Sequence, residues 1–256
     1  MTRSVSSESY PRRRTLGNVV TEGRQQIDEL PGGLHKMGSV LRNRVARAIK
    51  GLLPEAMVQE VQRYRSYKKF ERPLYLKIRI VNGLRLENPK RSRAPKTARS
   101  FLFVCFGNIM RSPMCEALMN RASAGRPNAQ VTVVSAGLNG IPGTAAHPWA
   151  VAAAREFGIS LEHHRARLLT PEMVDQADVI FAMDYQNQVQ LLSRFAGARD
   201  KLFMLSAYAG DSYHSVEIHD PYYLGQEETR HCYEILDTCI QNLVGSLADV
   251  SQDVSG

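Results

Sequence analysis

The chain has 256 residues, of which 43% are hydrophobic and 23% are charged. This composition is typical of a globular protein and excludes a collagen-like fibre or a wholly disordered chain. No apolar run approaches the roughly 20 residues that a membrane-spanning helix needs, and the first twenty residues lack the apolar stretch of a secretory signal. Four cysteines are too few for a disulfide framework, so a reducing, cytoplasmic setting is expected.

The net charge of +8 is divided unequally along the chain. Residues 1–99 contain 23 Lys and Arg against 8 Asp and Glu, whereas residues 100–256 contain 10 against 17. Two parts of opposite charge indicate different partners. We therefore expect a basic N-terminal extension over residues 1–98, which ends in a Pro-, Lys- and Arg-rich linker, and a second domain over residues 99–256.

The extension has weak signals of secondary structure. Residues 1–34 are polar and lack periodicity, which is typical of a mobile tail. Apolar residues recur at helical spacing over residues 38–53, and Pro54 suits the start of a second helix that runs to about Lys69. Apolar and polar residues alternate over Leu74–Val81, which predicts one strand.

From residue 100 onwards, short apolar runs alternate with helical patterns. This alternation predicts the α/β class, with a parallel sheet covered by helices on both faces. The expected strands are Phe101–Val104, Val131–Val134, Asp178–Met183 and Leu202–Leu205, and the expected helices are Pro113–Ala124, Pro148–Phe157, Tyr185–Phe195 and Gln226–Leu247.

The loop after the first of these strands has the features of an anion site. Cys105 ends the strand, and Gly107 and Asn108, the residue types most tolerant of positive φ, follow it. Ser112 and Pro113 suit the N-cap and the first position of the next helix. Backbone N–H groups at such a helix N-terminus favour a bound anion.

Two side chains give this loop its chemistry. Arg111, which five residues separate from Cys105, carries a planar fork that matches two phosphoryl oxygens. The positive field of the loop favours the thiolate of Cys105, and a thiolate beneath a bound phosphoryl group can attack phosphorus. The alternative is a buried strand-end cysteine beside a structural arginine, and the loop context disfavours it.

Asp220 is the candidate acid. It lies between the fourth strand and the last helix, and Pro221 holds it in an extended conformation. An aspartic acid there could protonate a departing phenolate and then take a proton from the attacking water. A turn-forming Asp-Pro pair is the alternative, but the presence of Cys105 and Arg111 favours catalysis.

Two segments resemble one known family. Val104–Pro113 (VCFGNIMRSP) resembles the phosphate-binding loop of the low-molecular-weight protein tyrosine phosphatases, and His219–Tyr223 (HDPYY) resembles their general-acid loop. The resemblance covers about residues 100–250. It implies the flavodoxin-like phosphatase fold, with a four-stranded parallel sheet flanked by helices, and a phosphocysteine enzyme that needs neither metal nor cofactor.

The resemblance also implies roles for single residues. Cys105 would be the nucleophile, Arg111 the phosphate clamp and Asp220 the acid and base. Asn108 and Ser112 would hold the loop and the thiolate by hydrogen bonds. The residues expected to bind substrate or phosphate are Phe106, Gly107, Asn108, Ile109, Met110, Ser112 and Tyr222.

Three further segments bear on substrate and regulation. Ile109 resembles the tyrosine-directed members, whereas members that act on phosphoarginine have Thr there. Residues 135–150 are most similar to bacterial members that act on tyrosine autokinases of capsule and exopolysaccharide export, so such a kinase is the expected partner. Met110 stands where many members have a second cysteine, so a protective disulfide with the nucleophile is not expected.

Two other functions compete with this reading. The related arsenate reductases pass a disulfide along three cysteines, but Cys232 and Cys239 would lie about 10 Å apart on one helix, too far for a disulfide. A non-catalytic phosphate-binding module is the second, and the complete set of Cys105, Arg111 and Asp220 disfavours it.

Other residues of these types are expected to be structural. Cys115 lies on the first helix of the domain and suits a small core residue. His164 is expected to cap a loop, because the histidines are not spaced as metal ligands.

The basic extension has three candidate partners. It could dock on the acidic domain of its own chain or on another protein. Its amphipathic helix over residues 38–53 could lie on an anionic membrane surface, which would place the enzyme at the cytoplasmic face of the inner membrane. Nucleic acid is disfavoured, because tyrosines among basic residues occur there without a recognisable binding motif.

Overall fold

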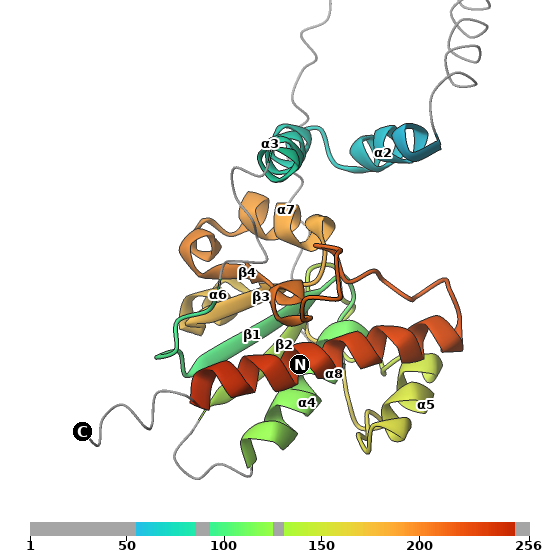
Figure 1. Ribbon diagram of the computed structural model, residues 1–256, viewed down its shortest axis with the longest axis vertical. Helices are drawn as coiled ribbons and strands as arrows, with labels where there is room; N and C mark the ends of the chain where they lie inside the picture. The colour runs from blue at the N-terminus through green and yellow to red at the C-terminus, as the bar shows by residue number, and fades with distance from the viewer. Residues whose placement is uncertain (1–54, 85–92, 125–130, 249–256) are drawn as a thin grey trace, which may run out of the picture. The chain divides into compact units, whose positions relative to one another are not determined.

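The computed structural model describes residues 55–84, 93–124 and 131–248 (Figure 1). The chain falls into two units, Met1–Val61 and Gln62–Gly256. The tail expected over residues 1–34 and the helix expected over residues 38–53 lie outside the described residues.

A four-stranded sheet forms the centre of the second unit. Its strands are β1 (Ser100–Cys105), β2 (Thr132–Gly137), β3 (Val179–Ala182) and β4 (Leu202–Met204). They lie in the order β2-β1-β3-β4, and every neighbouring pair is parallel. The predicted α/β class and four-stranded parallel sheet are confirmed.

Helices cover both faces of this sheet, because side chains alternate along each strand. Phe101, Phe103 and Cys105 of β1 face one apolar core, and Leu102 and Val104 face the other. The helices of the domain are α4 (Arg111–Ala124), α5 (Pro148–Glu156), α6 (Pro171–Gln176), α7 (Tyr185–Arg194) and α8 (Gln226–Ala248), with 3₁₀ turns η1 (Ala196–Lys201) and η2 (Leu205–Tyr208).

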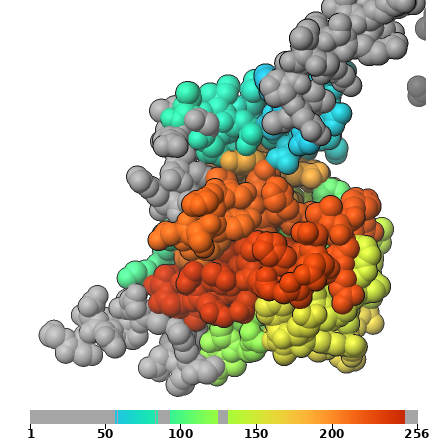
Figure 2. All heavy atoms as spheres, turned by 45° about the vertical axis from the view of Figure 1, so that its right-hand side comes forward, coloured from blue at the N-terminus to red at the C-terminus, as the bar shows by residue number. Residues whose placement is uncertain are grey.

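The two helical layers are distinct in the ribbon. Helices α4, α5 and α8 lie on one side of the sheet, and α6 and α7 lie on the other (Figure 1). The space-filling view shows α8, in red, lying along the surface of its layer (Figure 2), where it packs on α4 and α5. No helix in the described ranges is long and apolar enough to cross a membrane.

The strand order creates a crevice at the carboxyl ends of the strands. From β1 the chain passes to β2 on one side, and it then crosses over to β3 on the other side of β1. The loops that follow β1 and β3 therefore diverge, and ligands of open α/β sheets bind at such a switch point. Cys105 ends β1 and Asp184 follows β3, so both lie at this crevice.

Most helix predictions are close, but two details differ. Helix α4 begins at Arg111, two residues earlier than expected, so Ser112 is not an N-cap. Pro113 still lies in the first turn, where the amide hydrogen that it lacks would have no partner in the helix. Helix α6 was not predicted, because its six residues are too few to show periodicity.

The strand expected over Leu74–Val81 is wrong, because these residues lie in helix α3 (Arg72–Gly83). Pro73 in the first turn favours a helix start. Tyr75 and Ile78, three residues apart, lie on one helical face and pack with Tyr185 and Val189. The preceding helix α2 (Glu55–Ser66) agrees with the helix predicted after Pro54.

Candidate active site

The loop after β1 folds back over the sulfur of Cys105. Asn108 adopts a positive φ of 55°, and its backbone N–H donates to Cys105 Sγ at 3.3 Å. Ser112 Oγ lies 3.1 Å from the same sulfur. Although Cys105 is only 3% exposed, it lines a cavity. Its sulfur therefore lies at the base of that cavity, beneath the loop of residues 106–110.

The Asn108 side chain supports this loop from behind. Its Nδ2 donates to Ser112 Oγ at 2.9 Å and to Ser135 Oγ at 2.8 Å, and its Oδ1 accepts from the backbone N–H of Arg167 at 2.8 Å. Glu116 completes the network by accepting from Ser135 and from the Arg167 guanidinium. These bonds offset the cost of the left-handed backbone at Asn108. Asn108 and Ser112, grouped in the sequence with the substrate-binding residues, hold the loop and do not line the cavity.

His164 holds the same loop, which agrees with the structural role predicted for it. Its Nε2 lies 2.7 Å from the carbonyl oxygen of Asn108. Because a carbonyl can only accept, Nε2 carries the hydrogen. Burial lowers the pKa of His164, so the ring is neutral at pH 7 and donates through this one nitrogen.

Two glycines allow the loop to approach the sheet. A Cβ at Gly137 would lie 2.8 Å from the Gly107 carbonyl carbon, and one at Gly140 would lie 2.8 Å from the Gly107 oxygen. Any side chain at either position would displace the loop. Neither glycine was predicted to shape the site; their signal was a glycine at the end of the second strand and another three residues later.

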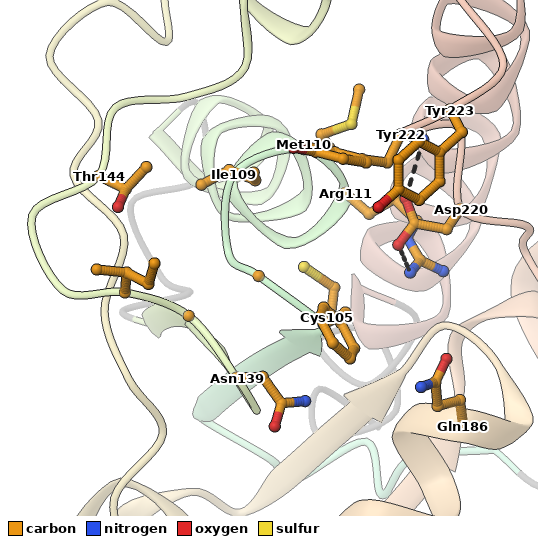
Figure 3. A pocket seen from close by; sticks show the side chains of 14 residues that line it. Cys105, Ile109, Met110, Arg111, Asn139, Thr144, Gln186, Asp220, Tyr222 and Tyr223 are labelled. Atoms are coloured by element: carbon orange, nitrogen blue, oxygen red, sulfur yellow. Dashed lines mark hydrogen bonds and ion pairs between the residues drawn. The ribbon is translucent and has the colours of Figure 1, made fainter. Parts of the chain in front are cut away.

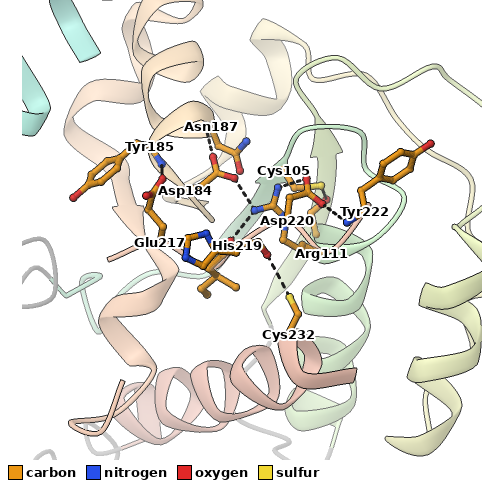
Figure 4. Close-up of polar contacts among 12 residues, drawn as sticks. Cys105, Arg111, Asp184, Tyr185, Asn187, Glu217, His219, Asp220, Tyr222 and Cys232 are labelled. Carbon is orange, nitrogen blue, oxygen red and sulfur yellow. Dashed lines mark hydrogen bonds and ion pairs between the residues drawn. The ribbon is translucent and has the colours of Figure 1, made fainter. Parts of the chain in front are cut away.

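Arg111 lies beneath the cavity in a nearly fully buried position, 1% exposed. Its Nη1 donates to Asp184 Oδ2 at 2.7 Å and to the Ile218 carbonyl at 2.8 Å, and its Nη2 donates to Asp220 Oδ2 at 2.5 Å (Figure 4). Burial opposes the charge, but the two carboxylates outweigh it and raise the pKa of Arg111. The guanidinium is therefore cationic and fixed in one plane.

Asp184 is a site residue that sequence analysis did not single out. It caps helix α7, since its Oδ1 accepts from the Asn187 N–H at 2.7 Å. Its other oxygen binds Arg111. The signal was an aspartate between a buried strand and a helix, at the sheet edge where Cys105 also lies.

Asp220 lies opposite the loop. Its Oδ1 accepts from the Tyr222 N–H at 3.2 Å, and its side chain is 38% exposed. Asp220 lines the same cavity as Cys105 and Arg111. The fold thus brings together three residues that 115 positions of sequence separate.

The cavity has a volume of about 530 Å³. Figure 3 shows Cys105 at its base, with Ile109 and Thr144 on one side and Asp220 and Tyr222 on the other. Of the residues predicted to bind substrate, five line it: Phe106, Gly107, Ile109, Met110 and Tyr222. The cavity is also lined by four residues that were not predicted, Asn139, Gly140, Thr144 and Gln186.

Aromatic rings stand at the mouth of this cavity. The Tyr222 ring lies edge-on to Tyr223, with centroids 4.7 Å apart, and edge-on to His147 at 5.2 Å. Tyr223 is 89% exposed. Such a wall suits a flat apolar group that leads to a charged end.

Two other cysteines, Cys115 and Cys232, do not line this cavity. Burial raises the pKa of Cys115 well above its ordinary value and that of Cys232 to about 12. Both are therefore neutral thiols at pH 7, which agrees with a core role for Cys115 and disfavours a thiolate relay through Cys232. No cluster of three potential metal ligands occurs among residues 55–84, 93–124 and 131–248.

Comparisons with known proteins place the chain in a family. The model of the family "Low molecular weight phosphotyrosine protein phosphatase" matches residues 100–255. The protein belongs to this family, and the predicted resemblance is confirmed.

Relatives differ in the substrate that their names give. A probable low molecular weight protein-tyrosine-phosphatase, EpsP of Ralstonia nicotianae, is 36% identical over 124 residues, which are 48% of this chain and 79% of the relative. The protein-arginine-phosphatase of Bacillus subtilis is 41% identical over 115 residues, 45% of this chain and 75% of the relative. The crystal structure of the Erwinia amylovora tyrosine phosphatase amsI is 30% identical, with a TM-score of 0.53 over 59% of this chain and 95% of that one.

Proposed function

We propose that the protein hydrolyses phosphotyrosine on proteins through a phosphocysteine intermediate. The observation that carries this proposal is the convergence of Cys105 Sγ, the Arg111 guanidinium and the Asp220 carboxyl on one cavity with an aromatic mouth.

Arg111 and the loop after β1 support binding of a phosphoryl group. Arg111 Nε is buried and has no hydrogen-bond partner among the described residues, and a phosphoryl oxygen would satisfy it. The backbone N–H groups of the loop after β1 precede helix α4, whose N-terminus favours negative charge.

In the first step, Cys105 Sγ attacks phosphorus. The S–P bond forms as the bond between phosphorus and the phenolic oxygen breaks, and the Asp220 carboxyl gives its proton to that oxygen. Ser112 Oγ, at 3.1 Å, stabilises the thiolate by a hydrogen bond. Arg111 holds the equatorial oxygens while their charge develops.

In the second step, water releases the phosphate. The Asp220 carboxylate, now deprotonated, takes a proton from the water whose oxygen attacks phosphorus. The S–P bond breaks and the thiolate of Cys105 is restored. No group other than the water and these residues is needed for the balance.

The substrate class is tested by comparing kcat/KM for matched phosphotyrosine and phosphoarginine peptides. Ile109 and the tyrosine wall support an aryl phosphate, whereas one relative is named a protein-arginine-phosphatase. We expect a phosphotyrosine peptide to show the higher kcat/KM, with or without chelator. A higher kcat/KM for the matched phosphoarginine peptide would contradict the proposal.

The physiological substrate that we propose is a bacterial tyrosine autokinase of exopolysaccharide export, on the sequence similarity of residues 135–150 to members that act on such kinases. The experiment is to recover proteins bound to an Asp220→Ala variant from the source cells and to probe them for phosphotyrosine. Recovery of other phosphoproteins in place of a kinase would contradict this assignment.

We also propose that the extension places the enzyme on an anionic bilayer at the cytoplasmic face of the membrane. On helix α3, Leu76 and Ile80 recur at helical spacing and are 50% and 49% exposed, and the following Leu84 is 64% exposed. Lys77 of the same helix and Lys69, which precedes the helix, are also exposed. An apolar stripe flanked by cations has the chemistry that anionic headgroups attract.

Vesicle sedimentation of the full chain tests this surface. We expect binding to phosphatidylcholine vesicles that contain phosphatidylglycerol, and loss of binding in Leu76→Gln/Ile80→Gln. Leu168→Gln, at an exposed leucine of the phosphatase domain, is the matched control. Absence of wild-type binding at low salt would show that the proposal is wrong.

A further inference from the structure

The segment Gln62–Gly83 precedes the part that the family model matches, yet it packs on the phosphatase domain. Tyr67 and Tyr75 stack with ring centroids 4.5 Å apart. Both are buried together with Tyr185 and Val189 of α7. This packing fixes α3 against the helix that begins directly after Asp184.

The first link to the active site passes through Tyr185. Asn82 Nδ2 donates to the Tyr185 hydroxyl at 3.1 Å, and the Arg79 guanidinium lies 5.2 Å from the centre of the Tyr185 ring. Tyr185 is the neighbour of Asp184, whose carboxylate holds Arg111. The segment therefore contacts the residue beside one support of the guanidinium.

The second link passes through Glu217. Arg63 Nη1 donates to Glu217 Oε2 at 2.6 Å, and the other oxygen of Glu217 accepts from the Tyr185 N–H at 3.1 Å. The Glu217 side chain is only 12% exposed. Figure 4 shows Glu217 directed at the start of α7, beneath Asp184. One carboxylate thus ties the extension to the N-terminus of α7.

Glu217 also begins the loop that carries the acid. The next residue, Ile218, donates its N–H to the Met183 carbonyl at 2.7 Å and accepts from Arg111 through its own carbonyl. Asp220 follows two residues later. The ion pair of Arg63 and Glu217 therefore lies one residue from a carbonyl that holds the phosphate clamp.

We propose that Arg63 and Glu217 are positioning residues, through which the extension sets the Arg111 clamp and the Asp220 loop for catalysis. They do not line the cavity. Their effect on turnover rests on the proposed function, whereas their effect on oxyanion binding does not.

The experiment uses full-length variants in which size is kept and charge is removed. Arg63→Gln should lower kcat on p-nitrophenyl phosphate about tenfold, because small misplacements of catalytic groups are costly, and should weaken inorganic phosphate binding measured by calorimetry. Arg63→Lys should restore part of both. Arg65→Gln, at an exposed arginine of the same helix, should leave both unchanged.

A double-mutant cycle separates positioning from loss of stability. Arg63→Gln/Glu217→Gln should lose no more activity than the worse single variant, and the kcat–pH profile should shift in all three. Losses that add, or an Arg63→Gln protein that matches Arg65→Gln in kcat, phosphate affinity and pH profile, would overturn the inference. If a variant fails to fold, amide exchange of residues 218–220 and 222 in Arg63→Lys is decisive, since a positioning role requires faster exchange than in wild type. If wild type lacks phosphatase activity, the phosphate affinities still decide.

Discussion

At the scale of single residues, the site depends on the hydrogen bonds made by the Cys105 sulfur and the Arg111 guanidinium. Cys105 accepts from the loop backbone, and Arg111 is held between Asp184 and Asp220. A neutral or shorter side chain at one of these positions removes a known hydrogen bond. The expected loss of activity can therefore be assigned to one step of the proposed reaction.

Replacement of Cys105 by serine should abolish aryl-phosphate hydrolysis, because an alcohol is not ionised at pH 7. Asp220→Ala should retain phosphate binding but reduce kcat by about 10²- to 10⁴-fold, the usual contribution of a general acid. Steady-state kinetics on p-nitrophenyl phosphate measure both. Asp211→Ala, at an exposed aspartate outside the cavity, is the control, and normal turnover by Cys105→Ser would refute the nucleophile.

His164 should make stability depend on pH. Because its pKa is lowered in the fold by burial, the unfolded chain binds more protons than the native state once the pH falls below about 6.5. The stability contributed by neutral His164 is therefore complete above that pH and declines as the medium becomes more acidic. The difference in Tm between wild type and His164→Asn should be larger at pH 7.5 than at pH 5.5.

The exposed neighbour His163 provides the comparison for this effect. His163→Asn should leave the pH dependence of Tm as it is in wild type. A His164→Asn protein whose Tm follows that of wild type at every pH would contradict the assigned bond to Asn108.

At the scale of elements, the loop after β1 is shaped by the strand beside it. Gly137 ends β2 opposite Cys105 in the parallel register, and only a glycine leaves room for the loop backbone. The shape of the loop therefore depends on a strand that contributes no side chain to the cavity.

Gly137→Ala should lower phosphate affinity and kcat/KM more than tenfold, since the added Cβ meets backbone atoms that cannot rotate away. Gly245→Ala, where nothing lies within 4 Å of the added carbon on helix α8, should instead stabilise the protein by about 0.5–1 kcal/mol. Calorimetric phosphate titration and thermal unfolding measure the two. Equal effects of both substitutions would contradict the close approach.

Helix α3 gives a second prediction at this scale. Tyr75 is 2% exposed against α7, whereas its neighbour Leu76 is 50% exposed. Tyr75→Ala should cost about 3–5 kcal/mol of unfolding free energy if α3 unfolds together with the domain, and Leu76→Ala should cost less than about 0.5 kcal/mol. Denaturant unfolding compares them, and similar midpoints would contradict the packing of α3.

At the scale of the whole molecule, charge is segregated along the chain, with an excess of 15 positive charges over residues 1–99 and of 7 negative charges over residues 100–256. We expect anionic surfaces to attract the basic part and to repel the acidic part. We accordingly propose two parts with different roles: an extension and linker over residues 1–98 and a phosphatase domain over residues 99–256.

Binding to anionic vesicles should therefore weaken steeply as salt increases, because the Debye length falls from about 10 Å at 0.1 M to about 3 Å at 1 M. Sedimentation at several salt concentrations measures this dependence. Turnover of p-nitrophenyl phosphate, measured without vesicles, should change far less over the same range, because Cys105 and Arg111 are buried. Binding that persists unchanged at 1 M salt would exclude an electrostatic attachment.

The sequence by itself determined the class of fold and predicted the central chemistry. Apolar runs of strand length alternate with helical patterns, and this alternation leaves few arrangements other than a parallel sheet between helices. Cys105, Arg111 and the residues between them are close in sequence, so local backbone preferences already bring them into one loop. Asp220 could be chosen in advance because the chemistry of that loop requires a remote acid.

Only the tertiary structure shows which residues act through packing. Alternation over Leu74–Val81 fits a strand as well as a helix, and contact with α7 selected the helix. Asp184, Gly137 and Arg63 were not predicted, because each acts on a group that is distant in sequence. Their roles depend on which elements become neighbours, and that follows from burial of apolar surface by the whole chain.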